Sequence, residues 1–179
     1  MKKLIFIFAI AAIACNEDPA EKTIDSDVTP ANENAADITY PYTASYSSKF
    51  EMGDPKHSKI IMEIWKDWDN NTLDNSTQHF ADSVNMSFPD GTTMSGSRDS
   101  ITAASKAYRE TMTEVSSHPA AFMPLKATDK NENWVAVWGK EVHTMNGKKD
   151  SINLHEIWLF NDADKVVRVV QYSAKIPKE

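Results

Sequence analysis

The sequence is short of cysteine, of basic clusters and of long apolar runs. Cys15 is the only cysteine among 179 residues, so no disulfide can form within the chain and stability must come from a packed core. The apolar run from Leu4 to Ile13 is about half as long as the roughly 20 residues that a membrane-spanning helix needs. Acidic residues outnumber basic ones by 26 to 19, and the net charge is −7. Neither nucleic acid nor electrostatic adsorption to anionic lipid is therefore expected.

Several signatures of catalysis and cofactor binding are also missing. The five histidines do not fall at metal-ligand spacing and no HExxH pattern occurs, so we expect no metal site. Without a phosphate-binding loop or a dinucleotide fingerprint, we expect no cofactor. The serine-nucleophile motif GxSxG is absent, and Ser95-Gly96-Ser97 has the pattern of a helix N-cap instead.

The first residues, MKKLIFIFAIAAIAC, carry the clearest positive signal. Two lysines, a short apolar stretch and small residues predict a signal peptide over residues 1–14. The run Ala12-Ile13-Ala14-Cys15 resembles the lipobox of bacterial lipoproteins, with Ala12 where leucine is commonest. The resemblance implies cleavage before Cys15, lipid on its thiol and amine, and membrane contact through this anchor alone. The alternative is an ordinary secreted protein with a stray cysteine.

The segment after the cysteine predicts a tether. Residues 16–39 hold seven acidic residues, one lysine, two prolines and no aromatic residue, which is too little apolar surface to fold. We therefore expect residues 15–39 to be an acidic, disordered tether carrying the lipidated cysteine. Its acidic start resembles surface-export signals. The leader resembles those of Gram-negative bacteria of the Bacteroidetes kind and implies the cell envelope, on the outer membrane, facing the periplasm or the surface.

Residues 40–53 differ in composition from the tether, with three tyrosines and a phenylalanine but no helical period. We interpret them as an extended aromatic arm that lies on the domain, and the alternative is an exposed linker that binds a partner. The globular domain is expected at residues 54–176, whose length of about 120 residues is enough for one hydrophobic core.

Three helices are expected in the first half of this domain. Asp54-Pro55 is a good start for the first helix, and Asn70-Asn71 ends it. Thr72 is expected to cap the second helix and Ser97 the third. The apolar faces are Ile60, Ile61, Ile64, Trp65 and Trp68 in the first helix, Leu73, Thr77 and Phe80 in the second, and Ile101, Ala104, Tyr108, Met112 and Val115 in the third.

Strands dominate the second half, because the apolar period becomes two from His118 onward. Asn146-Gly147 is a strong hairpin signal, and a turn is expected at Asn161-Asp162-Ala163-Asp164. The expected strands are Val84 to Phe88, Ala120 to Thr128, Asn133 to Met145, Ser151 to Phe160 and Val166 to Ala174. Helices segregated from an antiparallel sheet define an α+β fold.

Three stretches in this order carry a family resemblance: FADSVNMSFPDG (80–91), MSGSRDSITAASKAY (94–108) and HEIWLFNDADKVVRVVQY (155–172). They resemble the nuclear transport factor 2-like superfamily, and its SnoaL-like branch in particular. The resemblance implies a strongly curved antiparallel or mixed sheet wrapped around three N-terminal helices, with a conical cavity. The superfamily includes isomerases, cyclases, dehydratases, hydrolases and non-catalytic binders, so the fold alone does not assign a function. Members often dimerise through the outer sheet face, which makes a homodimer an expectation here.

The catalytic pattern of the ketosteroid isomerases in this superfamily is incomplete. The position of their aspartate base falls on Phe88, which cannot take a proton. The region of their oxyanion tyrosine holds Ile64 and Trp65. Only the acid on the penultimate strand has a counterpart, Glu156. Steroid-isomerase chemistry is therefore not expected.

Glu156 is the strongest candidate for a site residue. Strand alternation places it on the more apolar face with Leu154 and Trp158, where desolvation should raise its pKa. It could then donate a hydrogen bond to a ligand or act as a general acid or base. The alternative is a structural glutamate that pairs with Arg168 on the next strand or with a neighbouring histidine.

The inward face of the strand 133–145 is undecided by periodicity. Val137, Glu141 and His143 lie on one face, while the other face, with Trp134 and Trp138, is no less apolar. The family resemblance favours the first face inside, which would join Glu141 and His143 to Glu156. The two tryptophans would then lie outside, where they would suit an interface, and a core role for them is the alternative.

We expect the cavity to bind a small apolar or amphipathic molecule without catalysis. One alternative is an enzyme of the isomerase, cyclase or hydrolase kind that uses Glu156 with His143 or Glu141. Another is a protein-interaction module that pairs through the outer sheet face. The expected pocket residues are Trp65, Trp68, Phe80, Phe88, Val137, Leu154 and Trp158.

Overall fold

The computed structural model describes residues 39–176, and the fold lies in the unit Tyr42–Glu179. The predicted signal peptide (1–14), the lipidation site Cys15 and all but the last residue of the predicted tether lie outside the described residues. The elements are β1 (Phe50–Met52), α1 (Pro55–Asn70), the 3₁₀ helix η1 (Leu73–His79), β2 (Phe80–Ser87), β3 (Thr93–Ser97), α2 (Arg98–Arg109), β4 (Met112–Ala127), β5 (Glu132–Met145), β6 (Lys148–Phe160) and β7 (Val166–Lys175).

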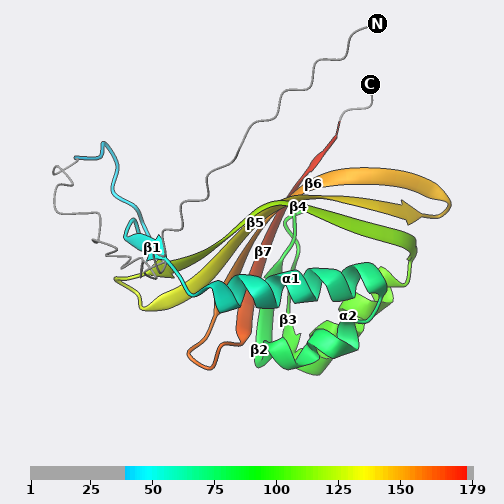
Figure 1. Cartoon of the computed structure of the whole chain (residues 1–179), viewed down its shortest axis with the longest axis horizontal. Coiled ribbons are helices and arrows are strands. Elements are labelled where there is room, and N and C mark those ends of the chain that lie inside the picture. Colours follow the sequence, from blue (N-terminus) through cyan, green and yellow to red (C-terminus); the bar gives the residue numbers. More distant parts are fainter. Residues whose placement is uncertain (1–38, 177–179) are drawn as a thin grey trace, which may run out of the picture. The chain divides into compact units, whose positions relative to one another are not determined.

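The strands of the described chain form one mixed sheet in the order β1-β4-β5-β6-β7-β2-β3. Strands β4 to β7 follow one another as an antiparallel meander, and β2 then pairs in parallel with β7. Helix α1 packs on β4 and β5, α2 packs on β2 and β3, and η1 contacts both helices (Figure 1). The α+β class expected from the sequence is confirmed.

Local capping signals set several boundaries as the sequence predicts. The Asp54 side chain accepts a hydrogen bond from the Lys56 amide at 2.9 Å, which caps α1. Asn71 ends that helix in the left-handed region, at φ 57°. The Ser97 hydroxyl accepts from the Ser100 amide at the start of α2. Asn146 also adopts a positive φ, as the tight hairpin between β5 and β6 requires.

The second predicted helix is shorter and tighter than expected. It is a 3₁₀ helix that ends at His79, so Phe80 opens β2 rather than closing a helix. Thr72 does not cap it, because the Thr72 hydroxyl donates backwards to the Asp67 carboxylate at 2.8 Å. Ser76 donates to the same carboxylate. These hydrogen bonds to Asp67 hold residues 72–76 in a tight turn, and the segment does not continue as an α-helix.

The third predicted helix also ends early, at Arg109, and the prediction that Met112 and Val115 share its face is wrong. Both residues belong to β4, which begins eight residues before the predicted start. Met112 pairs with Met145 of β5, and this long hairpin holds the segment extended. Strand β3 was not predicted, because TMSGS contains a single apolar residue and forms a strand only through its pairing with β2.

Residues 46–52 lie against one end of the β4–β5 hairpin. Strand β1 pairs with β4, with Phe50 opposite Ala127. The Tyr46 hydroxyl donates to Glu132, and the Tyr46 ring meets the Trp134 ring edge to face at 6.1 Å. An aromatic side chain thus adds to the backbone pairing of this short strand.

The hydrophobic core is formed where α1 crosses the sheet. Ile61, Ile64 and Trp65 pack from the helix against Val135 and Val137 of β5 and their neighbours on β6 and β7. Ile61 and both valines are fully buried. Of the helices in the described part of the chain, none is long and apolar enough to cross a bilayer.

Candidate functional site

A cavity of about 620 Å³ lies between the two helices and the inner face of the sheet. Its wall is built by α1, η1, α2 and residues of β2 to β7. Six of the seven pocket residues expected from the sequence line it: Trp65, Trp68, Phe80, Phe88, Leu154 and Trp158.

Val137 is the exception among the expected pocket residues. Its side chain is fully buried in the core and does not reach the cavity wall. Val137 lies directly opposite Glu156 across β5 and β6, with Ile61 of α1 in the same core cluster. Helix α1 therefore covers Val137, which belongs to the core and not to the cavity wall.

Glu156 lies in the cavity wall, and its carboxylate accepts three hydrogen bonds from neutral donors. Its Oε2 accepts from the indole Nε1 atoms of Trp65 at 2.7 Å and Trp158 at 3.0 Å, and its Oε1 accepts from Gln171 Nε2 at 2.7 Å. Burial raises the pKa of Glu156, while the three hydrogen bonds act in the opposite direction. The alternative in which Arg168 pairs with Glu156 is wrong, because Arg168 lies opposite Leu159 and Gln171 lies opposite Glu156.

The Trp65 indole reaches Glu156 because β5 carries a glycine beneath it. A Cβ at position 139 would lie 2.9 Å from two ring atoms of Trp65 and 3.0 Å from the His118 carbonyl oxygen. Gly139 thus lets the ring lie directly on the strand. Because position 139 has no side chain, the Trp65 ring can approach the strand closely enough for its indole N–H to donate to Glu156.

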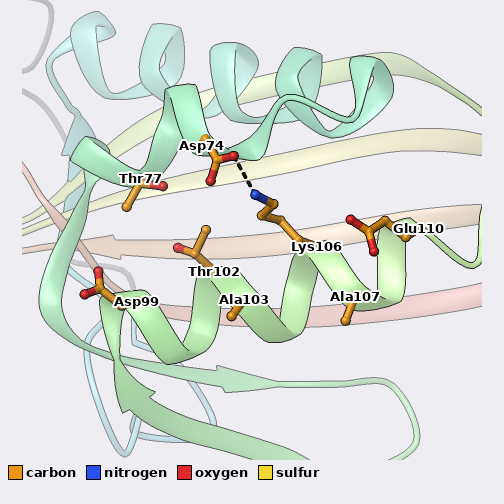
Figure 2. Close-up of a pocket in the computed structure, with 8 residues that line it drawn as sticks. All are labelled: Asp74, Thr77, Asp99, Thr102, Ala103, Lys106, Ala107 and Glu110. Atoms are coloured by element: carbon orange, nitrogen blue, oxygen red, sulfur yellow. Dashed lines mark hydrogen bonds and ion pairs between the residues drawn. The ribbon is translucent and has the colours of Figure 1, made fainter.

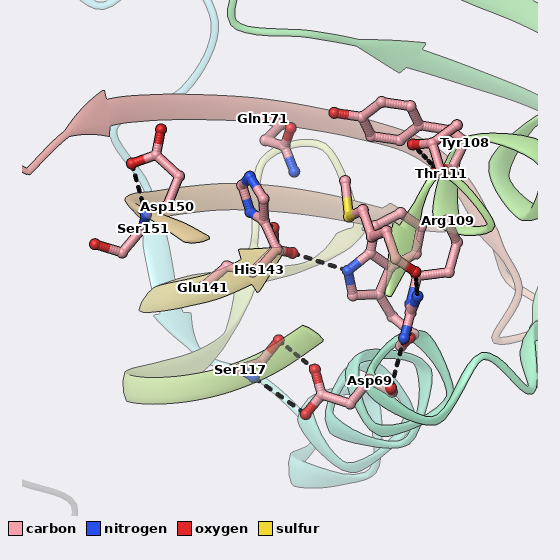
Figure 3. Close-up of polar contacts among 12 residues, drawn as sticks. Asp69, Tyr108, Arg109, Thr111, Ser117, Glu141, His143, Asp150, Ser151 and Gln171 are labelled. Atoms are coloured by element: carbon pink, nitrogen blue, oxygen red, sulfur yellow. Dashed lines mark hydrogen bonds and ion pairs between the residues drawn. The ribbon is translucent and has the colours of Figure 1, made fainter. Parts of the chain in front are cut away.

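The inner face of β5 is the one that carries Glu141 and His143. Glu141 is buried, and its Oε2 accepts from Trp68 Nε1 at 2.8 Å (Figure 3). Its Oε1 lies 2.8 Å from His143 Nδ1. Both residues line the cavity together with Glu156. The structure therefore brings all three candidate acid–base residues to one wall.

Gln171 and Tyr108 are cavity residues that the sequence analysis missed. Gln171 was open to detection, because it lies two residues from the buried Val169 on the same strand. Tyr108 was expected to pack on the apolar face of its helix, but it is half exposed and its ring lies 6.2 Å from the Trp68 ring.

The end of α1 is tied to the sheet and to α2 by two polar side chains (Figure 3). The Asp69 carboxylate accepts from the Ser117 amide at 3.1 Å and from its hydroxyl at 2.7 Å. The guanidinium of Arg109 donates to the backbone carbonyls of Trp68, Asp69 and Met112, at 2.7 to 2.9 Å. These contacts fix the Trp68 corner of the cavity.

A second hollow of about 420 Å³ lies between η1 and α2 (Figure 2). Its one basic side chain, Lys106, is paired with Asp74 at 2.5 Å. None of the site residues expected from the sequence lies in this hollow. Within residues 39–176, no group of histidine, aspartate and glutamate side chains is arranged to hold a metal ion.

The outer face of the sheet carries a stack of rings across three strands. The His155 ring lies 4.7 Å from Trp138 on β5 and 5.9 Å from Tyr172 on β7, nearly parallel to both. Trp138 is 39% exposed and Tyr172 is 54% exposed. Trp138 therefore lies outside the core, on the face where the sequence analysis placed a possible interface.

No protein-family model matches the chain, and no curated protein matches it. Solved structures do. A protein from Shewanella denitrificans assigned as a SnoaL-like polyketide cyclase has a TM-score of 0.57 at 11% identity, covering 68% of this chain and 92% of its own. AusH from Aspergillus nidulans has a TM-score of 0.55 at 7% identity, covering 72% and 90%.

A third solved structure is a protein of unknown function from Burkholderia pseudomallei, described as nuclear transport factor 2-like. Its TM-score is 0.54 at 17% identity, covering 66% of this chain and 90% of its own. These likenesses show that the chain has a nuclear transport factor 2-like fold, as its sequence predicts. At such identities they carry the fold and no particular activity.

Proposed function

We propose that the domain binds a small apolar or amphipathic molecule in the cavity between its helices and its sheet. The observation that carries this proposal is the cavity of about 620 Å³, whose wall is mostly aromatic and aliphatic with a few convergent polar groups. Volumes of roughly 300–1,000 Å³ and walls of this kind are typical of small-molecule sites. Glu156 and Trp65 would orient the ligand.

The polar side of the cavity is held in place before any ligand arrives. Glu156 is fixed by three hydrogen bonds, and Glu141 is fixed by Trp68 and His143. A site whose side chains are already ordered loses little conformational entropy when a ligand binds. This arrangement favours binding of a ligand over a purely structural role for the two glutamates.

Nile red, a neutral apolar dye, tests the proposal. We expect saturable binding with a blue-shifted emission, and Ile152→Trp should weaken it by about tenfold or more, because the larger side chain fills the cavity that Ile152 lines. Asn153→Trp is the matched control, since the neighbouring residue is exposed and does not line the cavity. Equal binding by both variants would place the dye elsewhere and contradict the proposal.

A lipid anchor at Cys15 belongs to the same proposal, and the sequence of residues 1–15 supports it. When the full chain is expressed in a Gram-negative bacterium, we expect it in the membrane fraction with the added mass of acyl chains. Cys15→Ser should move it to the soluble fraction, because stable membrane binding here depends on the lipid. A variant that still partitions with membranes would rule out the anchor.

An acid–base enzyme is the second candidate, favoured by the His143–Glu141 pair. A histidine held by a carboxylate through Nδ1 is oriented to exchange protons through Nε2. This enzyme would exchange protons next to the carbonyl of a small ketone such as cyclohexanone in deuterated water. NMR would follow the exchange, and His143→Gln should abolish it. Exchange at the rate of buffer alone would exclude this activity for that substrate class.

A further inference from the structure

The cavity wall carries acidic groups and no fixed basic group. Among the described residues that line it, Asp90, Glu141 and Glu156 are carboxylates, and none is a lysine or an arginine. His143 is the one lining side chain that can become cationic, and it is already hydrogen-bonded to Glu141. Such a wall repels carboxylate and phosphate ligands.

Glu156 is buried without a counter-ion. Only 5% of its surface is exposed, and its donors Trp65, Trp158 and Gln171 are all neutral. Within the described chain, no lysine, arginine or histidine lies within ion-pair distance of it. Each carboxylate oxygen can accept two hydrogen bonds, so Oε1, with one, keeps an open position. Burying a carboxylate in this way is costly unless a positive charge accompanies it.

The basic side chains near the cavity are engaged elsewhere. The Arg109 guanidinium donates to three backbone carbonyls, and Lys106 pairs with Asp74 in the second hollow. The described chain therefore supplies no lysine or arginine to the cavity, and a fixed positive charge there has to come with the ligand.

The remaining wall suits the apolar side of such a cation. Aromatic rings attract ammonium groups through their negative faces, and the attraction grows when the cation is shielded from water. The aromatic residues lining the cavity are Trp65, Trp68, Phe80, Phe88, Tyr108 and Trp158. Rings of this kind beside a carboxylate form a common recognition site for substituted ammonium groups.

We propose that the ligand of this cavity is an organic cation, an amine or quaternary ammonium group on an apolar body, with Glu156 as its counter-ion. This inference rests on the proposed binding function and names its ligand class. The cation lies against the aromatic wall, and the apolar body fills the space along Leu154 and Ile152.

Two probes of equal shape test the proposal by calorimetry on the full chain. Benzyltrimethylammonium carries the charge, and neopentylbenzene replaces its nitrogen by carbon. An uncharged apolar cavity would prefer neopentylbenzene, because water solvates the cation well. We expect the cation to bind tighter by about tenfold or more at pH 7.5. Equal or tighter binding of neopentylbenzene overturns the charge assignment and leaves the proposed function standing. Binding of neither probe, together with no Nile red binding, overturns both.

Variants assign the preference to Glu156. Glu156→Gln should remove the preference for the cation over neopentylbenzene. Glu114→Gln, at an exposed carboxylate of β4, should change neither affinity. Persistence of the full preference in Glu156→Gln contradicts the proposal.

The pH dependence of binding by the unmodified chain gives a readout that needs no variant. Cation affinity should fall on acidification as Glu156 takes up a proton, and this loss begins above the ordinary glutamate range because burial raises the pKa of Glu156. The other titratable groups facing the cavity are Glu141 and His143 on β5, Asp90 after β2 and Tyr108 on α2. Cation affinity that stays level or rises in acid overturns the proposal.

Discussion

We expect Arg109→Met to lower the free energy of unfolding by about 3 kcal/mol or more. Arg109 is 4% exposed and donates to the carbonyls of Trp68, Asp69 and Met112. Methionine keeps most of the apolar stem but none of the donors. Three carbonyl oxygens at the meeting point of α1, α2 and β4 would then lose a charged partner. The Trp68 carbonyl keeps the Asn71 amide as a donor, and each buried group left without one costs about 1–3 kcal/mol. Urea denaturation followed by tryptophan fluorescence measures the loss.

Arg98→Met is the matched control for this substitution. Arg98 lies at the other end of α2, is 36% exposed and pairs only loosely with Asp82 and Asp99, at 3.5 and 3.8 Å. Exposed pairs of this kind contribute about 0–1 kcal/mol. Equal losses of stability in the two variants would show that Arg109 contributes charge alone and does not hold the three elements together.

Glu156→Leu is expected to cost about 2–3 kcal/mol, whereas Glu156→Gln should cost little. Leucine leaves the indole N–H groups of Trp65 and Trp158 and the Gln171 amide without an acceptor in a buried site. Glutamine can keep both indole bonds on its oxygen and donate from its nitrogen to Gln171 once that amide turns over. Chemical denaturation of the three proteins at pH 7 gives the comparison, and a leucine variant as stable as the glutamine variant would refute it.

The wild-type protein and Glu156→Gln should also differ in how their stability varies with pH. Because burial raises the pKa of Glu156, the folded chain holds this proton to higher pH than the unfolded chain does. The wild-type protein therefore loses stability as pH rises from the ordinary glutamate range to the folded pKa. Glu156→Gln removes this loss, so the difference in stability between variant and wild type should shift in favour of the variant as pH rises. A constant difference would mean that Glu156 titrates alike in both states.

Local signals predicted the boundaries that depend on a few neighbouring residues. Asp54, Asn71 and Ser97 cap their helices as the sequence indicates, because each cap needs only backbone groups a few residues away. Met112 shows the limit of this reasoning. Its spacing from Tyr108 fits a helix, but pairing with the distant Met145 makes it a strand residue.

The candidate site was predicted where its residues depend on local sequence patterns, and missed where they depend on strand pairing. Alternation along one strand was enough to place Glu156 on the inner face, and aromatic residues on helical spacing were enough to place Trp65 and Trp68 beside it. The partners of Glu156 required the register between β6 and β7, which shifts at Leu159 and Phe160. Without that irregularity Val170 would lie opposite Glu156, and with it Gln171 does, while Arg168 lies opposite Leu159.

The parallel pairing of β2 with β7 has a consequence for how the chain folds. β7 is the last strand in the sequence, yet it lies inside the sheet, between β6 and β2. The β2–β3 pair and the helix that follows it can join the meander only after the C-terminal strand is in place. Contacts between residues so far apart in sequence make folding slow. The sheet consequently stays incomplete until β7 has been synthesised and has paired with both β6 and β2.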